Sequence, residues 1–416
     1  MKNEQDFTAE SLAIAGGYDA TSAHNSIKPP IYQTSTFKFN TAEEGKAFFQ
    51  KATGEAPLEE RNASLIYTRL NHPNAITAEY RLAKLDGAED AAFFESGMAA
   101  ISTTLLTFCN AGDLILMSTP LYGGTDAFIK KHLVNFGIDY VEFDPSDTKE
   151  QIKEKLMAHQ NAKKLKVIYV ETPANPTLAL TDISALDELR QEINQEGIHP
   201  VIVADNTYMG PIFQKPIAHG ADINVYSATK YIGGHSDIIA GAASGKDIYL
   251  KEIKKKRAIL GNTASPFTSW LLSRSLETIG LRMEKQAANA AKLADFLAGH
   301  PQVEKLHFLG TLNEEDGDYA LYKRQYTSAG AMMAVEIKGG ESEAFRFLNA
   351  LQLVQLAISL GSTETLASHP YTMSSSNMDE ADRLKSGITP NLVRISVGIE
   401  NPEDIIKDVK QALNAV

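Results

Sequence analysis

Residues 226–237 read Tyr226-Ser-Ala-Thr-Lys-Tyr-Ile-Gly-Gly-His-Ser-Asp237, directly after a β-rich apolar run. Lys230 therefore lies between small hydroxyl residues and a Gly-Gly pair. The small neighbours let a planar ligand approach the backbone, and Ser227 and Thr229 offer hydroxyl groups to an anion. The alternative is a surface lysine after a turn, but this is a poor position for a lysine that only solubilises a surface.

An apolar strand that ends in an acid, Val201-Ile-Val-Ala-Asp205, lies 25 residues upstream of this lysine. Either feature alone is weak, because a strand that ends in Asp often only caps the next helix. Together they supply a lysine able to form a Schiff base, an acid for a pyridinium nitrogen and hydroxyl groups for a phosphate. This combination indicates pyridoxal 5'-phosphate as the cofactor.

Size and composition exclude several classes of protein. A chain of 416 residues is long enough for two domains with substantial cores, and 43% hydrophobic with 22% charged residues is typical of a soluble globular protein. The net charge of −12, with no basic cluster to offset it, argues against a nucleic-acid partner. The first residues lack an apolar signal core and no run reaches membrane-spanning length, so we expect a cytoplasmic protein without a membrane partner.

Cys109 is the only cysteine. One thiol forms neither an intrachain disulfide nor a zinc cluster, so no metal site is expected. The thiol lies in the apolar run Leu105-Leu-Thr-Phe-Cys109, which favours a buried structural role over that of a nucleophile.

From about residue 75, helical patterns alternate with short β-rich runs. The expected strands are 91–94, 114–118, 140–143, 167–171, 201–204 and 223–226. The expected helices are 76–85, 98–108, 126–136, 149–158 and 183–196. This alternation implies βαβ crossovers and a mostly parallel sheet, so the predicted fold class is α/β.

Five residues with functional side chains fall just after predicted strands: Ser96, Tyr122, Asn175, Asp205 and Lys230. Ligands of such sheets bind beyond the carboxyl ends of the strands. The shared position of these residues therefore predicts a single site.

The chain is expected to have three parts. An N-terminal arm occupies 1–65, a cofactor-binding α/β domain 66–265, and a linking helix with a smaller α+β domain 266–416. In the third part we expect a long helix over 266–283 that continues over 286–297. A strand over 331–337, a helix over 341–351 and a strand over 392–397 should follow.

Several stretches resemble the cysteine/methionine-metabolism family of pyridoxal-phosphate enzymes. They are Pro30-Ile-Tyr-Gln-Thr-Ser-Thr-Phe37, Tyr67-Thr-Arg69, Ser96-Gly-Met-Ala-Ala100, Glu171-Thr-Pro-Ala-Asn-Pro176 and Leu392-Val-Arg-Ile-Ser-Val-Gly398. The resemblance covers nearly all of the chain. It implies the aspartate aminotransferase-type fold and an enzyme of sulfur amino-acid metabolism that acts on a small amino acid.

The resemblance also implies a role for each matched residue near the cofactor. Lys230 would hold the cofactor and move protons, which requires a low pKa for an amine. Asp205 would pair with the ring nitrogen. The phosphate would be bound by the helix-opening Ser96, Gly97 and Met98 and by Ser227 and Thr229.

Other matched residues lie further from this lysine in the sequence. Tyr67 and Arg69 would complete the phosphate site from the neighbouring subunit, with Arg69 bidentate, so the active form is at least a dimer and is expected to be a tetramer. Tyr122 would stack on the ring with its hydroxyl near the substrate amine, and Asn175 would bind the ring hydroxyl. The resemblance counts Tyr67 and Tyr122, with Lys230, as catalytic.

In the third part of the chain, Arg394 would bind the substrate carboxylate with help from Ser359. From residue type alone, an arginine that alternates with Val393 and Ile395 could equally face water. In the same way, Tyr122 could cover an apolar edge and Asn175 could simply form a turn.

The exact reaction is less certain from the sequence than the class. The segment Ala357-Ile-Ser-Leu-Gly361 resembles methionine γ-lyases, and an apolar Ile358 suits the methyl thioether of methionine. Gly124 and the pair Arg257-Ala258 differ from what methionine γ-lyases usually carry, and an extra segment over 42–62 departs from shorter members. We therefore expect a methionine γ-lyase-like carbon–sulfur lyase.

Other reactions stay open. Cystathionine γ-synthase, a cystathionine lyase and O-acetylhomoserine sulfhydrylase are the alternatives within the family. A cofactor-binding subunit that has lost catalysis is the alternative outside enzymes, although Lys230, Asp205 and Arg394 are all present.

Overall fold

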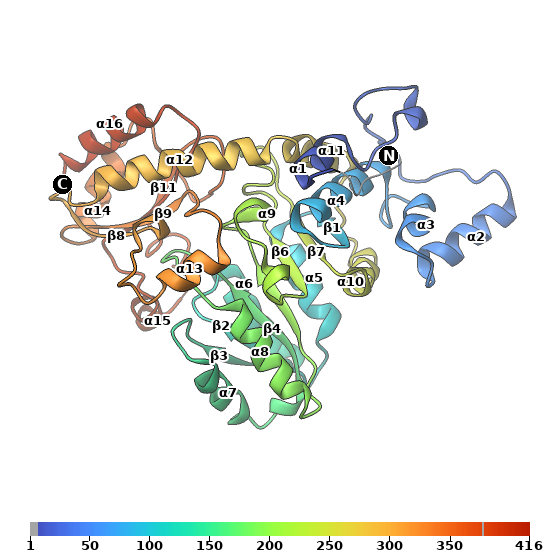
Figure 1. Ribbon diagram of the computed structural model, residues 1–416, viewed down its shortest axis with the longest axis horizontal. Helices are drawn as coiled ribbons and strands as arrows, with labels where there is room; N and C mark the ends of the chain where they lie inside the picture. The colour runs from blue at the N-terminus through green and yellow to red at the C-terminus, as the bar shows by residue number, and fades with distance from the viewer. Residues whose placement is uncertain (1–6, 377) are drawn as a thin grey trace.

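The computed structural model describes residues 7–376 and 378–416 (Figure 1). Residues 1–6, part of the stretch judged to lack a signal core, lie outside the described residues. The chain forms two sheets with helices around them, and the long helix α12 (Ile279–Leu297) runs along the upper side of the molecule in Figure 1, toward the second sheet.

The larger sheet has seven strands in the order β1-β7-β6-β5-β4-β2-β3. Neighbouring strands are parallel except at β7, which is antiparallel to both β1 and β6. The mostly parallel α/β sheet predicted from the sequence is thus confirmed. Its strands are β1 (Asp90–Phe94), β2 (Leu114–Ser118), β3 (Asp139–Phe143), β4 (Leu165–Glu171), β5 (Val201–Asp205), β6 (Ile223–Tyr226) and β7 (Gly241–Gly245).

The strands are apolar on both faces because helices cover both. Tyr169 and Val203 pack on one side with α5 (Gly97–Phe108) and α10 (Asp247–Leu260). Their neighbours along the strands, such as Ile168, pack on the other side with α7 (Lys149–Met157) and α8 (Ile183–Asn194). Burial on both faces explains why these strands read as continuous apolar runs rather than as an alternating pattern.

The smaller sheet follows the order β10-β11-β12-β9-β8 and is antiparallel apart from the pair β10 and β11. Apolar side chains of α12, α14 and α16 share a core with it. The elements are β8 (Val303–His307), β9 (Met332–Ile337), β10 (Gln355–Leu356), β11 (Leu366–Ser368), β12 (Leu392–Ser396), α14 (Glu341–Ala350) and α16 (Pro402–Leu413).

Two predicted helices differ from the structure. The helix expected over 126–136 is a short helix α6 (Gly123–Ala127) that continues into a π turn and a 3-10 turn. The long helix expected to start at residue 266 is broken into α11 (Pro266–Leu276) and α12. Glu277 at the break forms ion pairs with Lys28 and Arg81, which tie this junction to the N-terminal part of the chain.

The N-terminal segment is more helical than the arm expected over 1–65. Figure 1 shows α2 (Ala42–Thr53) and α3 (Leu58–Ala63) together at one end of the molecule. The remaining helices are α1 (Ala9–Ala15), α4 (Pro73–Asp86), α9 (Gly210–Phe213), α13 (Tyr319–Gln325) and α15 (Glu380–Lys385). Short 3-10 turns cover Ala20–Ala23, Ala162–Lys164, Pro216–His219 and Leu309–Thr311.

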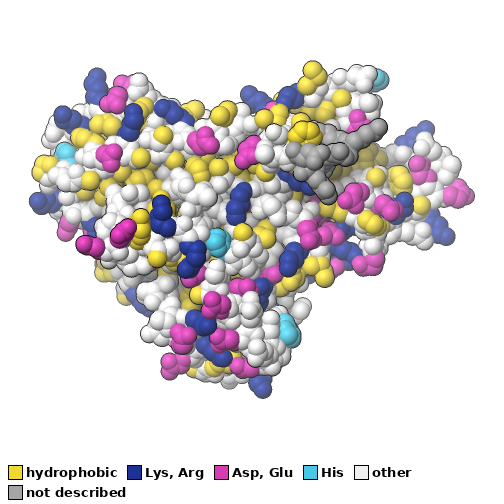
Figure 2. Space-filling model, viewed as in Figure 1, with side chains coloured by type: hydrophobic (Ala, Val, Ile, Leu, Met, Phe, Trp, Pro, Cys, Tyr) yellow, Lys and Arg dark blue, Asp and Glu magenta, His cyan; other side chains and the backbone are white. Residues whose placement is uncertain are grey.

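The surface carries both signs of charge. On the face seen in Figure 2, Lys and Arg side chains lie among Asp and Glu rather than in one block. Among the described helices, none is both long enough and apolar enough to cross a membrane.

Candidate active site

The turns after β1 and β6 touch each other. A Cβ built on Gly97 would lie 2.9 Å from the Cα of Ser227, so only glycine allows the first turn of α5 to approach the segment that leads to Lys230. Gly241, on β7 between these strands, is equally restricted, because a Cβ there would lie 2.0 Å from the Ser96 carbonyl oxygen. The structure therefore brings together the parts of the sequence that hold Ser96 and Lys230.

Lys230 lies in a partly buried position and reaches the second half of the chain. Its Nζ donates a hydrogen bond to Ser359 Oγ at 3.0 Å. Burial, and after it the positive charge of Arg394, lower the pKa of the Lys230 amine to about 8. A lysine with this pKa is uncharged far more often near neutral pH than an ordinary surface lysine.

Arg394 is buried on β12 and fixed by three acceptors. It donates to Asn175 Oδ1 at 3.1 Å and to the carbonyl oxygens of Ile358 and Ser359 at 2.9 and 3.1 Å. The arginine therefore does not face water, the alternative that its strand pattern left open. Ile358, by contrast, leaves 66% of its surface exposed.

Asp205 lies at the end of β5 and is buried. Its Oδ1 accepts from the Thr207 backbone N–H and hydroxyl at 3.1 and 2.6 Å, and its Oδ2 accepts from the Tyr169 hydroxyl at 3.2 Å. Glu171 is its register partner on β4. Burial raises the pKa of both carboxyl groups, and that of Glu171 reaches about 8 with the charge of Asp205 as the second cause.

Glu171 was not singled out as a site residue from the sequence, where it appears only inside a family motif. Its Oε2 accepts from the Tyr122 backbone N–H at 2.7 Å and its Oε1 from the Asn175 backbone N–H at 3.0 Å. One buried carboxyl thus holds the loops after β2 and β4 together. An acid at the end of a buried strand, as in Asp205, was the signal that could have identified it.

Two of the hydroxyl groups predicted to bind an anion, those of Ser96 and Thr229, already have protein partners. Ser96 Oγ caps α5 by accepting from Ala99 N–H at 3.0 Å. Thr229 Oγ1 donates to the Ala240 carbonyl at 3.2 Å and accepts from Ala240 N–H at 3.0 Å. The amides of Gly97 and Met98 open the helix and have no intrahelical acceptor, so they remain the stronger anion donors.

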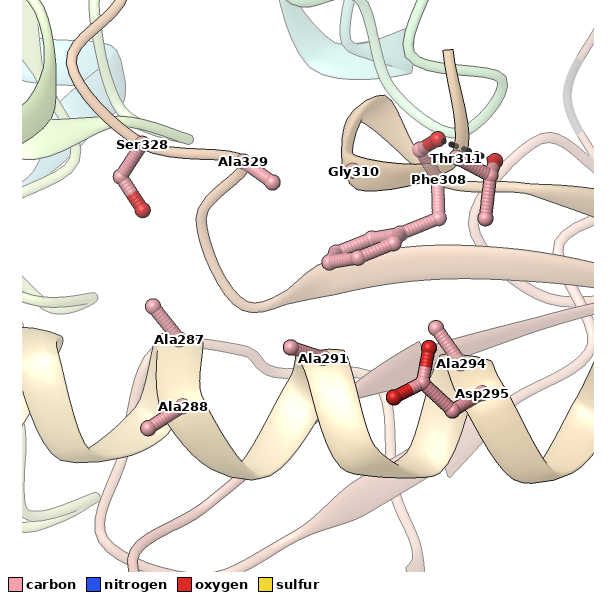
Figure 3. A pocket seen from close by; sticks show the side chains of 10 residues that line it. All are labelled: Ala287, Ala288, Ala291, Ala294, Asp295, Phe308, Gly310, Thr311, Ser328 and Ala329. Carbon is pink, nitrogen blue, oxygen red and sulfur yellow. Dashed lines mark hydrogen bonds between the residues drawn. The ribbon is translucent and has the colours of Figure 1, made fainter. Parts of the chain in front are cut away.

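A cavity elsewhere in the molecule is not a candidate for this chemistry. It has a volume of about 340 Å³ and lies between α12 and the segment 308–329 (Figure 3). Figure 3 shows alanines of α12 opposite Phe308, and Asp295 is the one charged side chain that lines it. Lys230 and Arg394 do not line this cavity.

Comparisons with known proteins agree with the geometry. The family model described as Cys/Met metabolism PLP-dependent enzyme, where PLP is pyridoxal phosphate, matches residues 10–414. The chain belongs to this family. The family resemblance and the enzyme class predicted from the sequence motifs are therefore confirmed.

Individual relatives cover the whole chain. An L-methionine gamma-lyase of Porphyromonas gingivalis is 42% identical over 97% of this chain and 96% of its own. A cystathionine gamma-lyase of Bacillus subtilis is 34% identical over 98% and 99%. The crystal structure of cystathionine gamma-lyase from Lactobacillus plantarum complexed with L-serine has a TM-score of 0.85 at 32% identity, with 99% of each chain covered. The likeness confirms the predicted fold type.

The strand-end residues of this Cys/Met metabolism family member fit a pyridoxal phosphate group. Asp205 and Glu171 are buried neighbours, so a cation beside them is favoured, such as a protonated pyridine nitrogen. The amides that open α5 and the adjacent Ser227 form a donor set suited to a phosphate. Lys230 supplies a partly desolvated amine.

Two residues matched to the family lie elsewhere in this chain. Tyr67 and Arg69 are exposed, with the Arg69 guanidinium 5.9 Å from the Tyr67 ring. Arg69 Nη1 donates to the Ala258 carbonyl, and its own carbonyl accepts from Thr263 Oγ1 at 2.9 Å. These contacts are with the end of α10 and the segment after it, not with Lys230.

Gly124 is closely surrounded by other side chains in this structure. A Cβ at this position would lie 2.6 Å from Tyr122 Cε1 and 3.2 Å from Met98 Sδ. Any side chain here requires the Tyr122 ring to move. The position of this ring therefore depends on the glycine.

Proposed function

We propose that this protein is a carbon–sulfur lyase that acts by γ-elimination on a sulfur amino acid, with methionine as the first candidate. Methionine and water would give 2-oxobutanoate, ammonia and methanethiol, which balances in all atoms. The Cα–H, one Cβ–H, the Cγ–S and finally the C–N bonds break, protons return to the leaving sulfur and to the carbon chain, and water supplies the oxo oxygen. The names of the relatives and the apolar Ile358 support this substrate over a polar one.

In this proposal, pyridoxal 5'-phosphate is held by Lys230 through its amine, by Asp205 at the ring nitrogen and by the α5 turn with Ser227 and Thr229 at the phosphate. Tyr122 would stack on the ring, and Asn175 would bind the ring hydroxyl through its amide nitrogen, since the Asn175 Oδ1 already accepts from Arg394. The bound cofactor supplies an electron sink that acidifies the substrate Cα.

The observation that carries the proposal is the position of the partly buried Lys230 amine, which donates a hydrogen bond to Ser359 Oγ at 3.0 Å. At pH 7.5, a pKa of about 8 leaves about a quarter of the amine uncharged, against roughly one part in a thousand for an ordinary lysine. The uncharged Nζ is suited to accept the Cα proton and to deliver protons to the leaving sulfur, and Ser359 holds Nζ on this path.

Substrate binding would use the second sheet. Arg394, desolvated on β12, would bind the α-carboxylate, since a buried guanidinium is attracted to a carboxylate far more strongly than an exposed one. Ile358 would contact the distal group. The proposed division at 66–265 and 266–416 places Lys230 in one domain and Arg394 in the other, with the substrate between them.

The proposal includes a second subunit. Tyr67 and Arg69 would complete the phosphate site of a neighbouring chain, in a dimer that pairs into a tetramer. A mixed oligomer of Arg69→Ala and Lys230→Ala chains should recover activity that neither variant has alone, and a mixture without recovery contradicts the shared site. We also propose that the protein acts in the cytoplasm, and cell fractionation tests this location.

Product analysis tests the reaction. The purified, cofactor-loaded protein is given methionine, cystathionine, or O-acetylhomoserine with a thiol, and 2-oxobutanoate, pyruvate and new thioether are measured. Methanethiol and 2-oxobutanoate from methionine are expected. Turnover only with an activated homoserine ester and a thiol would refute the lyase and favour a synthase.

Gly124 favours a second candidate, a cystathionine enzyme, because many of these have glycine at this position. Turnover of cystathionine with no release of methanethiol from methionine would select it. A protein that binds the cofactor and turns over none of these compounds would instead be a non-catalytic subunit.

A further inference from the structure

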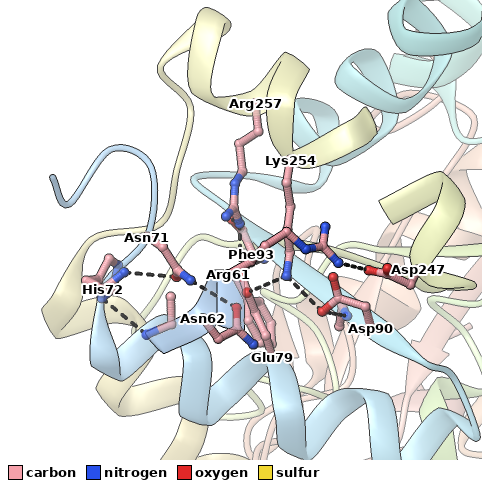
Figure 4. Close-up of polar contacts among 12 residues, drawn as sticks. Arg61, Asn62, Asn71, His72, Glu79, Asp90, Phe93, Asp247, Lys254 and Arg257 are labelled. Carbon is pink, nitrogen blue, oxygen red and sulfur yellow. Dashed lines mark hydrogen bonds and ion pairs between the residues drawn. The ribbon is translucent and has the colours of Figure 1, made fainter. Parts of the chain in front are cut away.

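The extra segment over 42–62 ends in the helix α3, of which two polar residues, Arg61 and Asn62, contact other parts of the protein. Arg61 on α3 leaves only 9% of its side chain exposed and forms an ion pair with Asp247 at the start of α10. Asn62 Oδ1 accepts from Asn71 Nδ2 at 3.2 Å. Figure 4 shows both contacts, which join α3 to two other parts of the chain.

Asn71 belongs to the loop that carries Arg69. The backbone N–H groups of Leu70 and Asn71 both donate to the Tyr67 carbonyl, and Asn71 Oδ1 accepts from His72 N–H at 2.9 Å. Arg69 itself is held by Ala258 at the end of α10. The loop 67–71 is therefore fixed between α3 and the C-terminal end of α10.

A buried ionic cluster fixes α10 to the sheet. Arg257 donates to Glu79 on α4 and to the Phe93 carbonyl on β1, both at 2.7 Å, and Phe93 N–H donates to Glu79 at 3.1 Å. Lys254 contacts Glu79 and Asp90 at 3.1 and 2.8 Å (Figure 4). The two cations lower the pKa of Glu79, although burial opposes them.

This cluster links the Ser96 turn of this chain's own proposed phosphate site to the loop that would complete the phosphate site of a neighbouring chain. β1 leads directly into the Ser96 turn, and residue 258, which holds Arg69, follows Arg257 in α10. The cluster makes α4, β1 and α10 one unit, and α3 is attached to this unit at Asp247. Loss of the attachment would leave the loop 67–71 with fewer anchors.

We propose that α3 is a positioning element, in which Arg61 and Asn62 fix the loop 67–71 so that Arg69 is held ready for the phosphate of the cofactor. This inference rests on the role proposed for Arg69. If the loop is correctly placed for only a tenth of the time without α3 contacts, the apparent cofactor affinity falls about tenfold.

The test is cofactor titration of the cofactor-free protein, followed by visible absorbance. Arg61→Gln removes the charged guanidinium group and keeps a polar side chain, and we expect the dissociation constant to rise about tenfold. Glu55→Gln is the matched control, because Glu55 also pairs with α10, through Lys251, but is 91% exposed. Its dissociation constant should stay within about twofold of the unmodified protein.

A double variant separates a positioning role from a general loss of stability. If Arg61 acts through Arg69, the variant with both Arg61→Gln and Arg69→Ala binds the cofactor no more weakly than Arg69→Ala alone. Additive losses would overturn the inference, as would an unchanged dissociation constant in Arg61→Gln. Asp247→Asn removes the same ion pair from the other side and replaces Arg61→Gln if that variant does not fold.

The two proposals fail in different ways. If Arg69→Ala weakens cofactor binding but Arg61→Gln does not, only the positioning role of α3 is refuted. If Arg69→Ala leaves cofactor binding unchanged, the proposed role of Arg69 is refuted, and the inference about α3 is refuted with it.

Discussion

Glu171→Gln tests whether one buried carboxyl organises the cofactor site. Glu171 accepts one hydrogen bond on each oxygen, from Tyr122 N–H and from Asn175 N–H. Glutamine keeps the shape but has a single oxygen. One of the two amide N–H groups must therefore face an NH₂ group, which donates and cannot accept.

The size of the effect follows from this count. A buried donor that loses its acceptor costs about 1–3 kcal/mol. The two loops carry Tyr122 and Asn175, which are proposed to stack on the cofactor ring and to bind its hydroxyl. We therefore expect most of this free-energy cost to appear as weaker cofactor binding. Cofactor affinity should then fall by about 5- to 150-fold.

The pH dependence of stability gives a second measure of the same residue. The pKa of Glu171 rises from 4.5 to about 8 in the folded protein because of burial, so between these values the folded state keeps a proton that the unfolded state loses. The stability of the cofactor-free protein should fall as pH rises through this window. Glu171→Gln should flatten that slope.

Cofactor titration and thermal unfolding of the cofactor-free protein between pH 5 and 8 make these measurements. Glu188→Gln is the control, because this carboxyl is 64% exposed and lies on α8. Wild-type affinity together with an unchanged pH slope in Glu171→Gln would refute the organising role.

Three further predictions concern the chemistry. Lys230→Ala should leave the circular dichroism spectrum unchanged and abolish turnover, and retained activity would contradict the mechanism. Ile358→Glu should lower kcat/KM for methionine relative to cystathionine by about tenfold or more, and an unchanged ratio would exclude contact with the distal group. Gly124→Ala should weaken cofactor binding by about 2- to 10-fold through displacement of the Tyr122 ring, whereas unaltered binding would show that the ring does not stack.

The strands of the large sheet were predictable because each combines an apolar run with a following turn. β7 was not found, since Gly241-Ala-Ala-Ser-Gly245 contains none of the β-branched or aromatic residues that mark strands. Its two glycines are explained by contacts between distant parts of the sequence, Gly241 by the close approach of the Ser96 carbonyl and Gly245 by that of the Asp222 carbonyl.

The site was predictable to the extent that its residues follow strands. Asp205, Asn175 and Lys230 each lie directly after or at the end of one, so the fold brings them to the same edge. The hydrogen bonds that organise them were not predictable, because they depend on register. Glu171 reaches the Tyr122 amide in the loop after β2 because β2 and β4 are neighbouring strands, and it lies beside Asp205 because β4 pairs with β5 in that register.

The proposed binding of the substrate carboxylate by Arg394 would link substrate binding to the basicity of Lys230. Its positive charge is the second cause of the low pKa of this lysine. A carboxylate bound at Arg394 neutralises that charge, so the pKa of Lys230 should rise and the amine should become a stronger base once substrate is bound. Burial, the first cause, would remain, and the pKa would stay below its ordinary value.

This coupling is measurable without turnover. The rate at which acetic anhydride labels Lys230 in the cofactor-free protein, quantified by mass spectrometry across pH, should have its midpoint near pH 8 and shift upward with saturating butyrate. In Arg394→Gln, the labelling midpoint without butyrate should be higher than in the unmodified protein, and butyrate should not shift it. An identical midpoint with and without butyrate in the unmodified protein would show that Arg394 does not tune the lysine, and its role would be limited to holding the substrate.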